Sequence, residues 1–80
     1  GAWLLDGLMP IAELKSRLHI DDDLPDDDKG RYNTLAGLLM AVQGGLPQQG
    51  DQISCGGWRF EVQALEGRRL DRIRAEKLVV

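Results

Sequence analysis

The stretch Trp58-Arg59-Phe60-Glu61-Val62-Gln63-Ala64 alternates apolar and polar side chains from end to end. Successive side chains of a strand point to opposite faces of a sheet, so this pattern predicts a β-strand with one buried face. Gly56-Gly57 stands directly before it, and a two-residue glycine turn is typical of a β-hairpin. We therefore expect the short, strand-like residues 51–55 to pair with this strand.

A last strand is expected over residues 68–79. Within it, Leu70 and Ile73 are out of phase by one residue with a strict apolar–polar alternation. An extra residue in one strand of a pair restores the phase of the side chains. We therefore predict a β-bulge near Asp71 or Arg72.

The N-terminal part of the chain predicts one strand followed by one helix. The apolar run Ala2-Trp3-Leu4-Leu5 ends at Asp6-Gly7, a pair that is typical of a tight turn or a bulge after a strand. Ile11, Leu14 and Leu18 then recur at spacings of three and four residues, which is one face of a helix.

A second helix is expected to begin after an N-cap at Asn33 or Thr34 and to end at Gly44-Gly45. Most of its residues are apolar, so we expect it to be the central helix, covered nearly all round. Gly37 lies inside it and costs about 1 kcal/mol of helix stability relative to alanine, which predicts a close approach of another backbone there. Its buried face is expected to carry four apolar residues, Leu35, Leu38, Leu39 and Val42.

The order strand-helix-helix-strand-strand-strand predicts an α+β fold, a small antiparallel sheet with two helices packed on one face. The aromatic residues Trp3, Trp58 and Phe60 are expected in its core. Cys55 and His19 are the only soft metal ligands, and one of each cannot complete a tetrahedral zinc site. No constellation of residues supports catalysis, so we do not expect an enzyme.

Length and composition indicate a soluble piece of a longer protein. Residues 1–80 are enough for a single domain. No apolar run approaches the ~20 residues that cross a membrane as a helix. The chain begins at Gly1-Ala2 without a methionine, as expected for a fragment. Any membrane-spanning part of the parent protein is therefore expected elsewhere.

Six aspartates form an acidic segment early in the chain. Carboxylate oxygens are the ligands that Mg²⁺ and Ca²⁺ prefer, so this segment is a candidate site for a divalent cation. Its spacing does not match an EF-hand loop, and a solvated loop of like charges is the alternative interpretation. The six residues are Asp21, Asp22, Asp23, Asp26, Asp27 and Asp28.

Four arginines fall close together on the expected last strand, namely Arg68, Arg69, Arg72 and Arg74. They are candidates for docking against an acidic surface, on a neighbouring domain or on a second copy in a homodimer. A plain solvent-exposed face is the alternative. Nucleic acid is not expected as a partner, because the net charge is −3 and no nucleic-acid-binding motif is present.

Taken in order, three groups of residues resemble one family, the transporter-associated domain of CorC/HlyC-type proteins, which are magnesium and cobalt efflux or hemolysin-related membrane proteins. The resemblance covers essentially the whole chain. Its motifs are Trp3-Leu4-Leu5-Asp6-Gly7, then Thr34-Leu35-Ala36-Gly37-Leu38-Leu39 with Leu46-Pro47-Gln48-Gln49-Gly50-Asp51, and Trp58-Arg59-Phe60-Glu61-Val62 leading to Arg72-Ile73.

The resemblance implies a parent protein with a transmembrane domain and a nucleotide-binding pair of the cystathionine-β-synthase type, followed by this domain on the cytoplasmic face of the membrane. It implies a regulatory role in ion transport, and no agreed catalytic residues. It also implies a fold grouped with flavin-binding domains, which makes FAD or adenine-nucleotide binding a further alternative. The glycine pairs Gly44-Gly45 and Gly56-Gly57 do not form a dinucleotide fingerprint, and we expect them to be turn residues.

Overall fold

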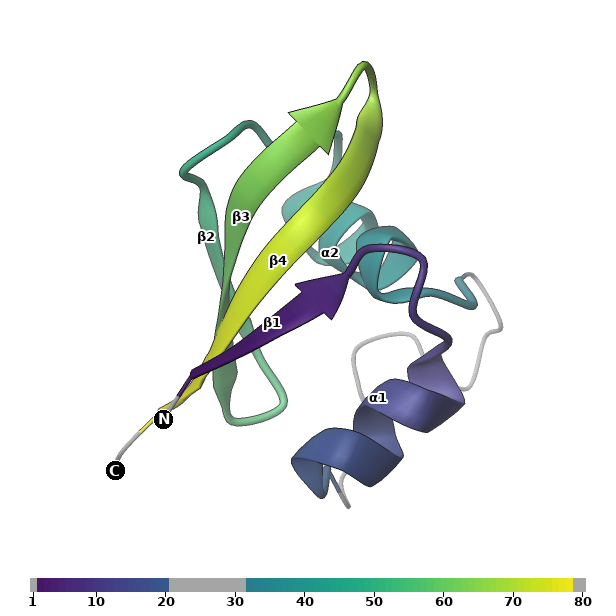
Figure 1. Ribbon diagram of the computed structural model, residues 1–80, viewed down its shortest axis with the longest axis vertical. Helices are drawn as coiled ribbons and strands as arrows, with labels where there is room; N and C mark the ends of the chain where they lie inside the picture. Colours follow the sequence, from purple (N-terminus) through teal and green to yellow (C-terminus); the bar gives the residue numbers. More distant parts are fainter. Residues whose placement is uncertain (1, 21–31, 79–80) are drawn as a thin grey trace.

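The structure, a computed structural model, describes residues 2–20 and 32–78. It confirms the expected order of elements and the α+β fold (Figure 1). Strand and helix bounds follow the predictions closely, and the last two strands are each nine residues long. The elements are β1 (Ala2–Asp6), α1 (Ile11–Leu18), α2 (Leu35–Gln43), β2 (Gln52–Cys55), β3 (Trp58–Glu66) and β4 (Arg69–Lys77).

The four strands form one antiparallel sheet in the order β1-β4-β3-β2. The first and last strands of the chain therefore lie side by side, and β1 and β2 form the two edges of the sheet. The β2–β3 hairpin turns at Gly56 and Gly57, whose φ angles of 63° and 82° require glycine-like backbone freedom. The predicted two-residue hairpin is confirmed.

The pairing of β3 with β4 contains two compensating irregularities. Val62 lies opposite Ile73 and Ala64 lies opposite Arg72, so Gln63 is an extra residue on β3. The next pair, Leu65 and Leu70, leaves Asp71 as an extra residue on β4. The bulge predicted near Asp71 is confirmed, and the one at Gln63 was not predicted. Together the two bulges keep the apolar side chains on both sides of them on the inner face.

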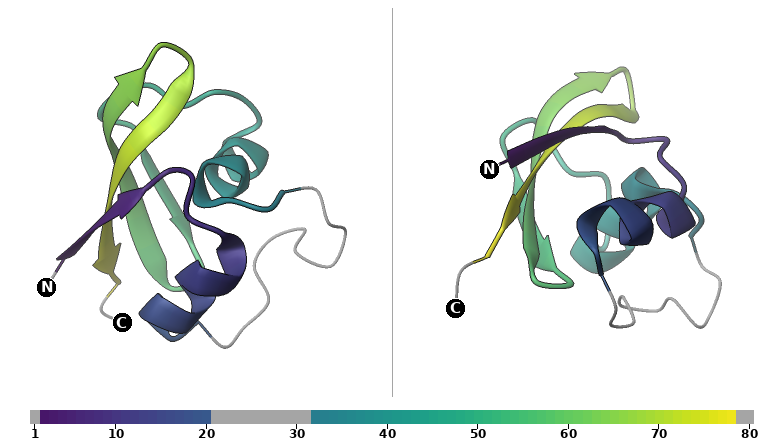
Figure 2. Two further views of the ribbon diagram at one scale, coloured as in Figure 1. Left: turned by 45° about the vertical axis from the view of Figure 1, so that its right-hand side comes forward. Right: turned by 60° about the horizontal axis from the view of Figure 1, so that its bottom comes forward.

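Both helices lie on the same side of the sheet, as Figure 2 shows. Their apolar faces and the inner face of the sheet enclose one hydrophobic core. Within the described ranges no polar or charged residue is buried, so the core is held by apolar packing alone. The largest fully buried side chains of the described residues are Phe60, Leu14, Leu35, Leu38, Leu39, Leu70, Ile73, Val62 and Pro47.

The starts of the two helices are tied together by backbone hydrogen bonds. The Ile11 N–H donates to the Asn33 carbonyl, and the Leu35 N–H donates to the Met9 carbonyl, both at 2.9 Å. Thr34 is the N-cap of α2, because its hydroxyl accepts a hydrogen bond of 3.1 Å from the Gly37 N–H. The predicted cap is confirmed, and it fixes the entry of the chain into α2.

The prediction that α2 is covered nearly all round was wrong. Leu35, Leu38 and Leu39 are buried, but Met40 and Val42 are 38% and 37% exposed. The reason is the two-layer architecture: a helix that packs on one face of a sheet has only one side against the core. The backbone approach predicted at Gly37 was also wrong: an added Cβ would lie 2.8 Å from the Cβ of the Tyr32 side chain, whereas the nearest backbone atom, the Tyr32 Cα, would be 3.6 Å away.

The prediction that all three aromatic residues lie in the core holds for Phe60 and Trp58 and fails for Trp3, which is 45% exposed. Trp3 lies opposite Ala75 on β4, so both side chains are on the inner face of the sheet. However, β1 is an edge strand. An inner-face residue at the rim of a small sheet has a neighbouring strand on only one side. Its large ring therefore stays partly in solvent.

Candidate docking surface

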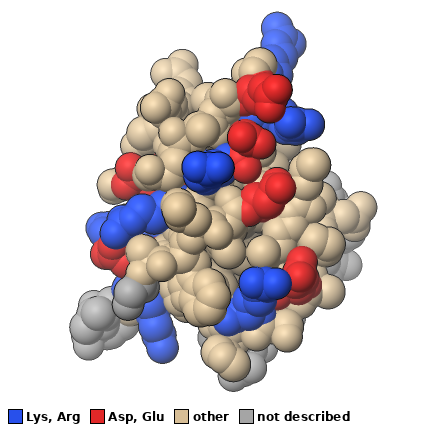
Figure 3. Space-filling view, in the orientation of Figure 1, with Lys and Arg blue, Asp and Glu red and all other residues tan. Residues whose placement is uncertain are grey.

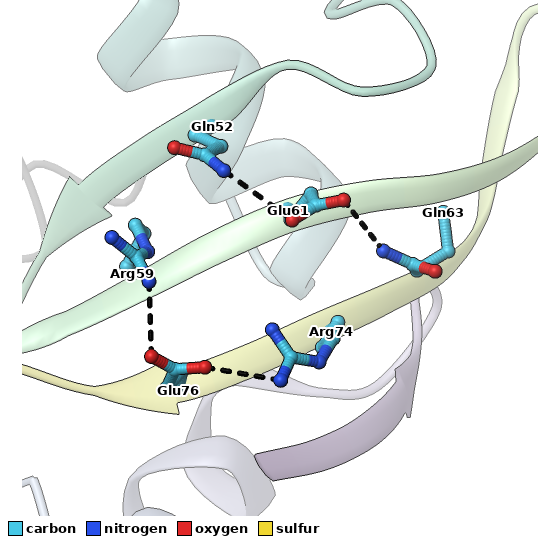
Figure 4. Close-up of polar contacts among 6 residues, drawn as sticks. All are labelled: Gln52, Arg59, Glu61, Gln63, Arg74 and Glu76. Carbon is cyan, nitrogen blue, oxygen red and sulfur yellow. Dashed lines mark hydrogen bonds and ion pairs between the residues drawn. The ribbon is translucent and has the colours of Figure 1, made fainter.

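The outer face of the sheet, opposite the helices, carries an ordered network of polar side chains (Figure 4). Glu76 on β4 accepts a hydrogen bond of 2.9 Å from Arg59 and forms an ion pair with Arg74 at 3.0 Å. Glu61 on β3 accepts from Gln52 at 3.4 Å and from Gln63 at 2.9 Å. Each carboxylate therefore links polar neighbours on the same face of the sheet.

These outer-face interactions organise the surface more than they stabilise the fold. The ion-paired side chains of Arg59, Arg74 and Glu76 are 38–40% exposed. Exposed ion pairs contribute only about 0–1 kcal/mol each. In the space-filling view, acidic and basic side chains are interspersed over the face that is shown (Figure 3). A partner that binds here would meet charges that are already paired.

The structure places two of the four predicted docking arginines in ion pairs. Arg74 bonds to Glu76, as above. Arg69 lies 3.1 Å from Glu66 and 4.0 Å from Asp71. The charge of each is therefore largely balanced within the domain.

The other two arginines, Arg68 and Arg72, form no ion pair with a residue that the structure describes. Both are exposed. Arg68 lies in the turn between β3 and β4, and Arg72 lies opposite Asp6 in the pairing of β4 with β1. Their two guanidinium groups are the basic groups on this part of the surface that are best placed to meet an acidic partner.

A hollow of about 440 Å³ lies where β1 meets the bulge of β4. Arg72 is part of its wall, so one of the two arginines borders a recess in the surface. The hollow is open, not an enclosed cavity, and it is lined by Leu4, Leu5, Asp6, Asp71 and Arg72.

Two groups of exposed apolar side chains were not predicted as surface features. The first group lies on β1 and just beyond its end. It consists of Trp3, Leu4 and Leu8, which are 45%, 65% and 54% exposed. The second surrounds the end of α2 and consists of Met40, Val42 and Leu46. The sequence shows that these residues are apolar but not that they are exposed; the exposure of Trp3 follows from the edge position of β1.

The acidic segment, Asp21, Asp22, Asp23, Asp26, Asp27 and Asp28, lies outside the described residues. Within the parts of the chain that are described, no group of three or more His, Cys, Asp or Glu side chains could hold a metal ion.

Burial raises the pKa of the Cys55 thiol to about 11. At neutral pH this thiol is protonated, so it is a poor nucleophile.

The turn at residues 48–51 is organised around one carboxylate. Asp51 accepts hydrogen bonds from the Gln48 N–H at 2.9 Å and from the Gln43 amide at 3.0 Å. These bonds lower the pKa of Asp51 below its ordinary value.

The Gly44 φ of 84° marks the end of α2, as predicted. In residues 2–20 and 32–78 no helix is both long enough and apolar enough to cross a membrane.

Comparison with known proteins identifies relatives over the whole length of the chain. Residues 1–79 match the CorC_HlyC family, described as "Transporter associated domain". A UPF0053 protein of Synechocystis is 37% identical over 98% of this chain, and a protein of Salmonella typhimurium named "Polyamine export protein" is 31% identical over 96%. The chain spans only 17% of the length of each of these two relatives.

A solved structure shares the fold. It is the transporter associated domain CorC_HlyC from a Xylella fastidiosa hemolysin, in complex with Mg²⁺ and Mn²⁺. The two chains are 33% identical, with a TM-score of 0.85, and the match covers 99% of this chain and 90% of that one.

Proposed function

Since this chain belongs to the CorC_HlyC family of transporter-associated domains, we propose that it is a regulatory docking module of a membrane transport protein. It acts on the cytoplasmic face of the membrane by binding neighbouring domains or subunits of that transport protein. The relatives support this proposal, because the matched part is a small fraction of much longer proteins. The main observation in favour of docking is that Arg68 and Arg72 are exposed and unpaired among the described residues. The other two arginines of this strand region, Arg69 and Arg74, already form ion pairs.

In this mechanism the domain transmits a change of state through contacts, not through chemistry. An acidic surface on the cystathionine-β-synthase-type pair or on the transmembrane part faces Arg68 and Arg72 in one state of the transporter. Docking then stabilises that state by the difference between its binding free energies for the two states. The transported substrate is a cation in this proposal. Magnesium, cobalt and polyamines are all cations, and the Salmonella typhimurium relative is named a polyamine export protein.

The double substitution Arg68→Gln and Arg72→Gln is expected to weaken binding of the domain to the rest of its transport protein by about tenfold or more, which is about 1.4 kcal/mol. The two charges have no partner among the described residues, so their loss acts on docking and not on folding. The two parts are produced as separate polypeptides, and their Kd is measured by calorimetry at low and high salt. Screening is expected to weaken the unmodified complex as salt rises.

The matched control is the double substitution Arg17→Gln and Arg59→Gln, which also removes two positive charges. Arg17 and Arg59 already pair with Glu13 and Glu76. The control is therefore expected to bind as the unmodified domain does. Equal weakening in both variants, or an unchanged Kd in the first, would contradict docking through Arg68 and Arg72.

A second candidate function is divalent-cation sensing by the acidic segment. It is favoured by one specific observation, the Mg²⁺ and Mn²⁺ in the related Xylella structure. Six carboxylates within residues 21–28 supply the hard oxygen ligands that these ions prefer. In this case the domain reports the concentration of the cation to the transporter.

Sensing predicts that millimolar Mg²⁺ raises the melting temperature of the domain. A cation that binds only the folded state at tenfold its Kd adds about 1.4 kcal/mol, which corresponds to a rise of roughly 6–11 °C in a domain of this size. Differential scanning calorimetry with MgCl₂, against NaCl of equal ionic strength, measures it. Replacing the six aspartates with asparagine is expected to abolish the rise. An equal rise in both salts contradicts sensing.

A further inference from the structure

β1 is an edge strand with an apolar surface. Its one hydrogen-bonded neighbour in the described sheet is β4, so its other edge has no partner strand among the described residues. Leu4 is the most exposed large apolar side chain of the described residues, at 65%, and it is the middle residue of the strand. Trp3 beside it and Leu8 just beyond the strand are also exposed.

β1 lacks the features that usually keep a sheet edge from pairing with another chain. Such edges carry lysine, proline or a bulge, or are very short. The strand Ala2–Asp6 is five residues long, it contains no lysine or proline, and its pairing with β4 runs without a register shift. Its only charge is Asp6, at its end. The opposite edge, β2, is four residues long and exposes the polar Gln52 and Ser54.

We propose that β1 pairs antiparallel with β1 of a second copy of this chain, around a two-fold axis at Leu4. Leu4 then lies opposite Leu4 of the second copy, Trp3 opposite Leu5, and Ala2 opposite Asp6. The two sheets become one continuous sheet of eight strands, four from each copy. This pairing depends on β1 and not on Arg68 or Arg72, so it stands or falls independently of docking through the arginines.

Side-chain alternation restricts the register of this pairing. Leu5 is buried on the inner face, together with its partner Ile73, whereas Leu4 pairs with Arg74 on the outer face. A slip of one residue would set inner-face residues opposite outer-face residues, so the two helix layers would lie on opposite sides of the joined sheet. A slip of two residues would leave part of each strand unpaired. The register centred on Leu4 keeps all of Ala2–Asp6 paired.

Charge also favours a second copy as the occupant. In the register centred on Leu4 the one charged residue of the strand, Asp6, faces the small neutral Ala2, so no like charges meet across the join. Within its own chain the Asp6 carboxylate accepts a hydrogen bond of 2.8 Å from the Leu8 N–H. Leu4 meets Leu4 and Trp3 meets Leu5, so each apolar side chain covers another. Cross-strand apolar pairs of this kind contribute favourably to sheet pairing.

Sedimentation velocity over a range of concentrations, with charged substitutions at Leu4, tests the pairing. The unmodified chain is expected to dimerise in a way that is little affected by salt. Leu4→Glu alone and Leu4→Lys alone place like charges opposite each other at the axis, and each is expected to be monomeric. An equimolar mixture of the two is expected to dimerise again, because opposite charges then meet. Circular dichroism verifies that both variants are folded.

Met40 provides the control, because it is exposed on α2, away from β1. Met40→Glu and Met40→Lys are expected to dimerise like the unmodified chain. The proposal is overturned if the unmodified chain stays monomeric to millimolar concentration. It is also overturned if the Leu4 variants dimerise normally, or if their mixture stays monomeric.

A disulfide gives an independent measurement of the register. Leu4→Cys, made together with Cys55→Ala, places two thiols opposite each other with Cα atoms about 4.5–5.5 Å apart, which is within the range that a disulfide bridges. Mild oxidation is expected to convert most of this variant to a covalent dimer on a non-reducing gel. Leu46→Cys in the same background is the control at another exposed position. Equal rates of cross-linking in the two variants would exclude the proposed register.

Discussion

Replacing Gly7 with alanine is expected to destabilise the domain by about 3 kcal/mol or more, at the upper end of the effects of single substitutions. A Cβ at this position would overlap the carbonyl oxygen of Leu70 and come within 2.9 Å of its carbonyl carbon. Both atoms belong to the backbone of β4, so no side-chain rotation relieves the contact. Urea unfolding followed by circular dichroism measures the loss in free energy of unfolding.

The reason for so large an effect is that Gly7 connects the two layers. Its N–H donates to the Asp71 carbonyl of β4 at 3.3 Å, and its carbonyl accepts from the Ala36 N–H of α2 at 2.9 Å. Moving this backbone to make room for a methyl group would weaken both hydrogen bonds. The substitution therefore acts on the sheet and on the helix layer together.

Gly45→Ala is the matched control for Gly7→Ala. Gly45 has nothing within 4 Å of an added Cβ, and its φ lies outside the left-handed region. Alanine at such a site restricts the unfolded chain, so it is expected to be neutral or to stabilise by about 0.4–1 kcal/mol. A loss below about 1 kcal/mol for Gly7→Ala would show that β4 yields to the added methyl group, contrary to the tight contact described above.

Local patterns predicted most of the fold. The alternation from Trp58 to Ala64, the three-and-four spacing in α1 and the glycine turn at Gly56-Gly57 each depend on neighbours in sequence, and all three are confirmed. The pairing of β1 with β4 and the close contact of Gly7 with Leu70 depend on residues far apart in the chain. No local pattern encodes them, so Asp6-Gly7 predicted only a turn.

Exposure was the main quantity that sequence could not give. Trp3 and Val42 are as apolar as the core residues. What exposes them is their position, at the sheet edge for Trp3 and on the outer side of a single helix layer for Val42. Similarly, a run of arginines predicted a basic surface, but only the structure separates the paired Arg69 and Arg74 from Arg68 and Arg72.

Phe60→Ala is expected to lower the free energy of unfolding by about 3–5 kcal/mol, the usual cost of removing a buried phenylalanine ring. Phe60 is completely buried in the middle of the sheet, between Ala75 on β4 and Ile53 on β2. Ala75 is too small to fill the space that the ring leaves. Domains of this size have a total stability of roughly 5–15 kcal/mol, so the variant is expected to lose a large part of it and to melt more than about 12 °C lower.

The adjacent residue gives the sharpest comparison, because alternation turns it to the other face of the sheet. Arg59→Ala removes a longer side chain than Phe60→Ala does, yet it breaks only the half-exposed ion pair with Glu76. Its cost is expected to be within about 1 kcal/mol. The difference between the two variants thus measures how much of the stability resides in the inner face. Equal losses at both positions would mean that the outer-face network, and not the core, holds the sheet together.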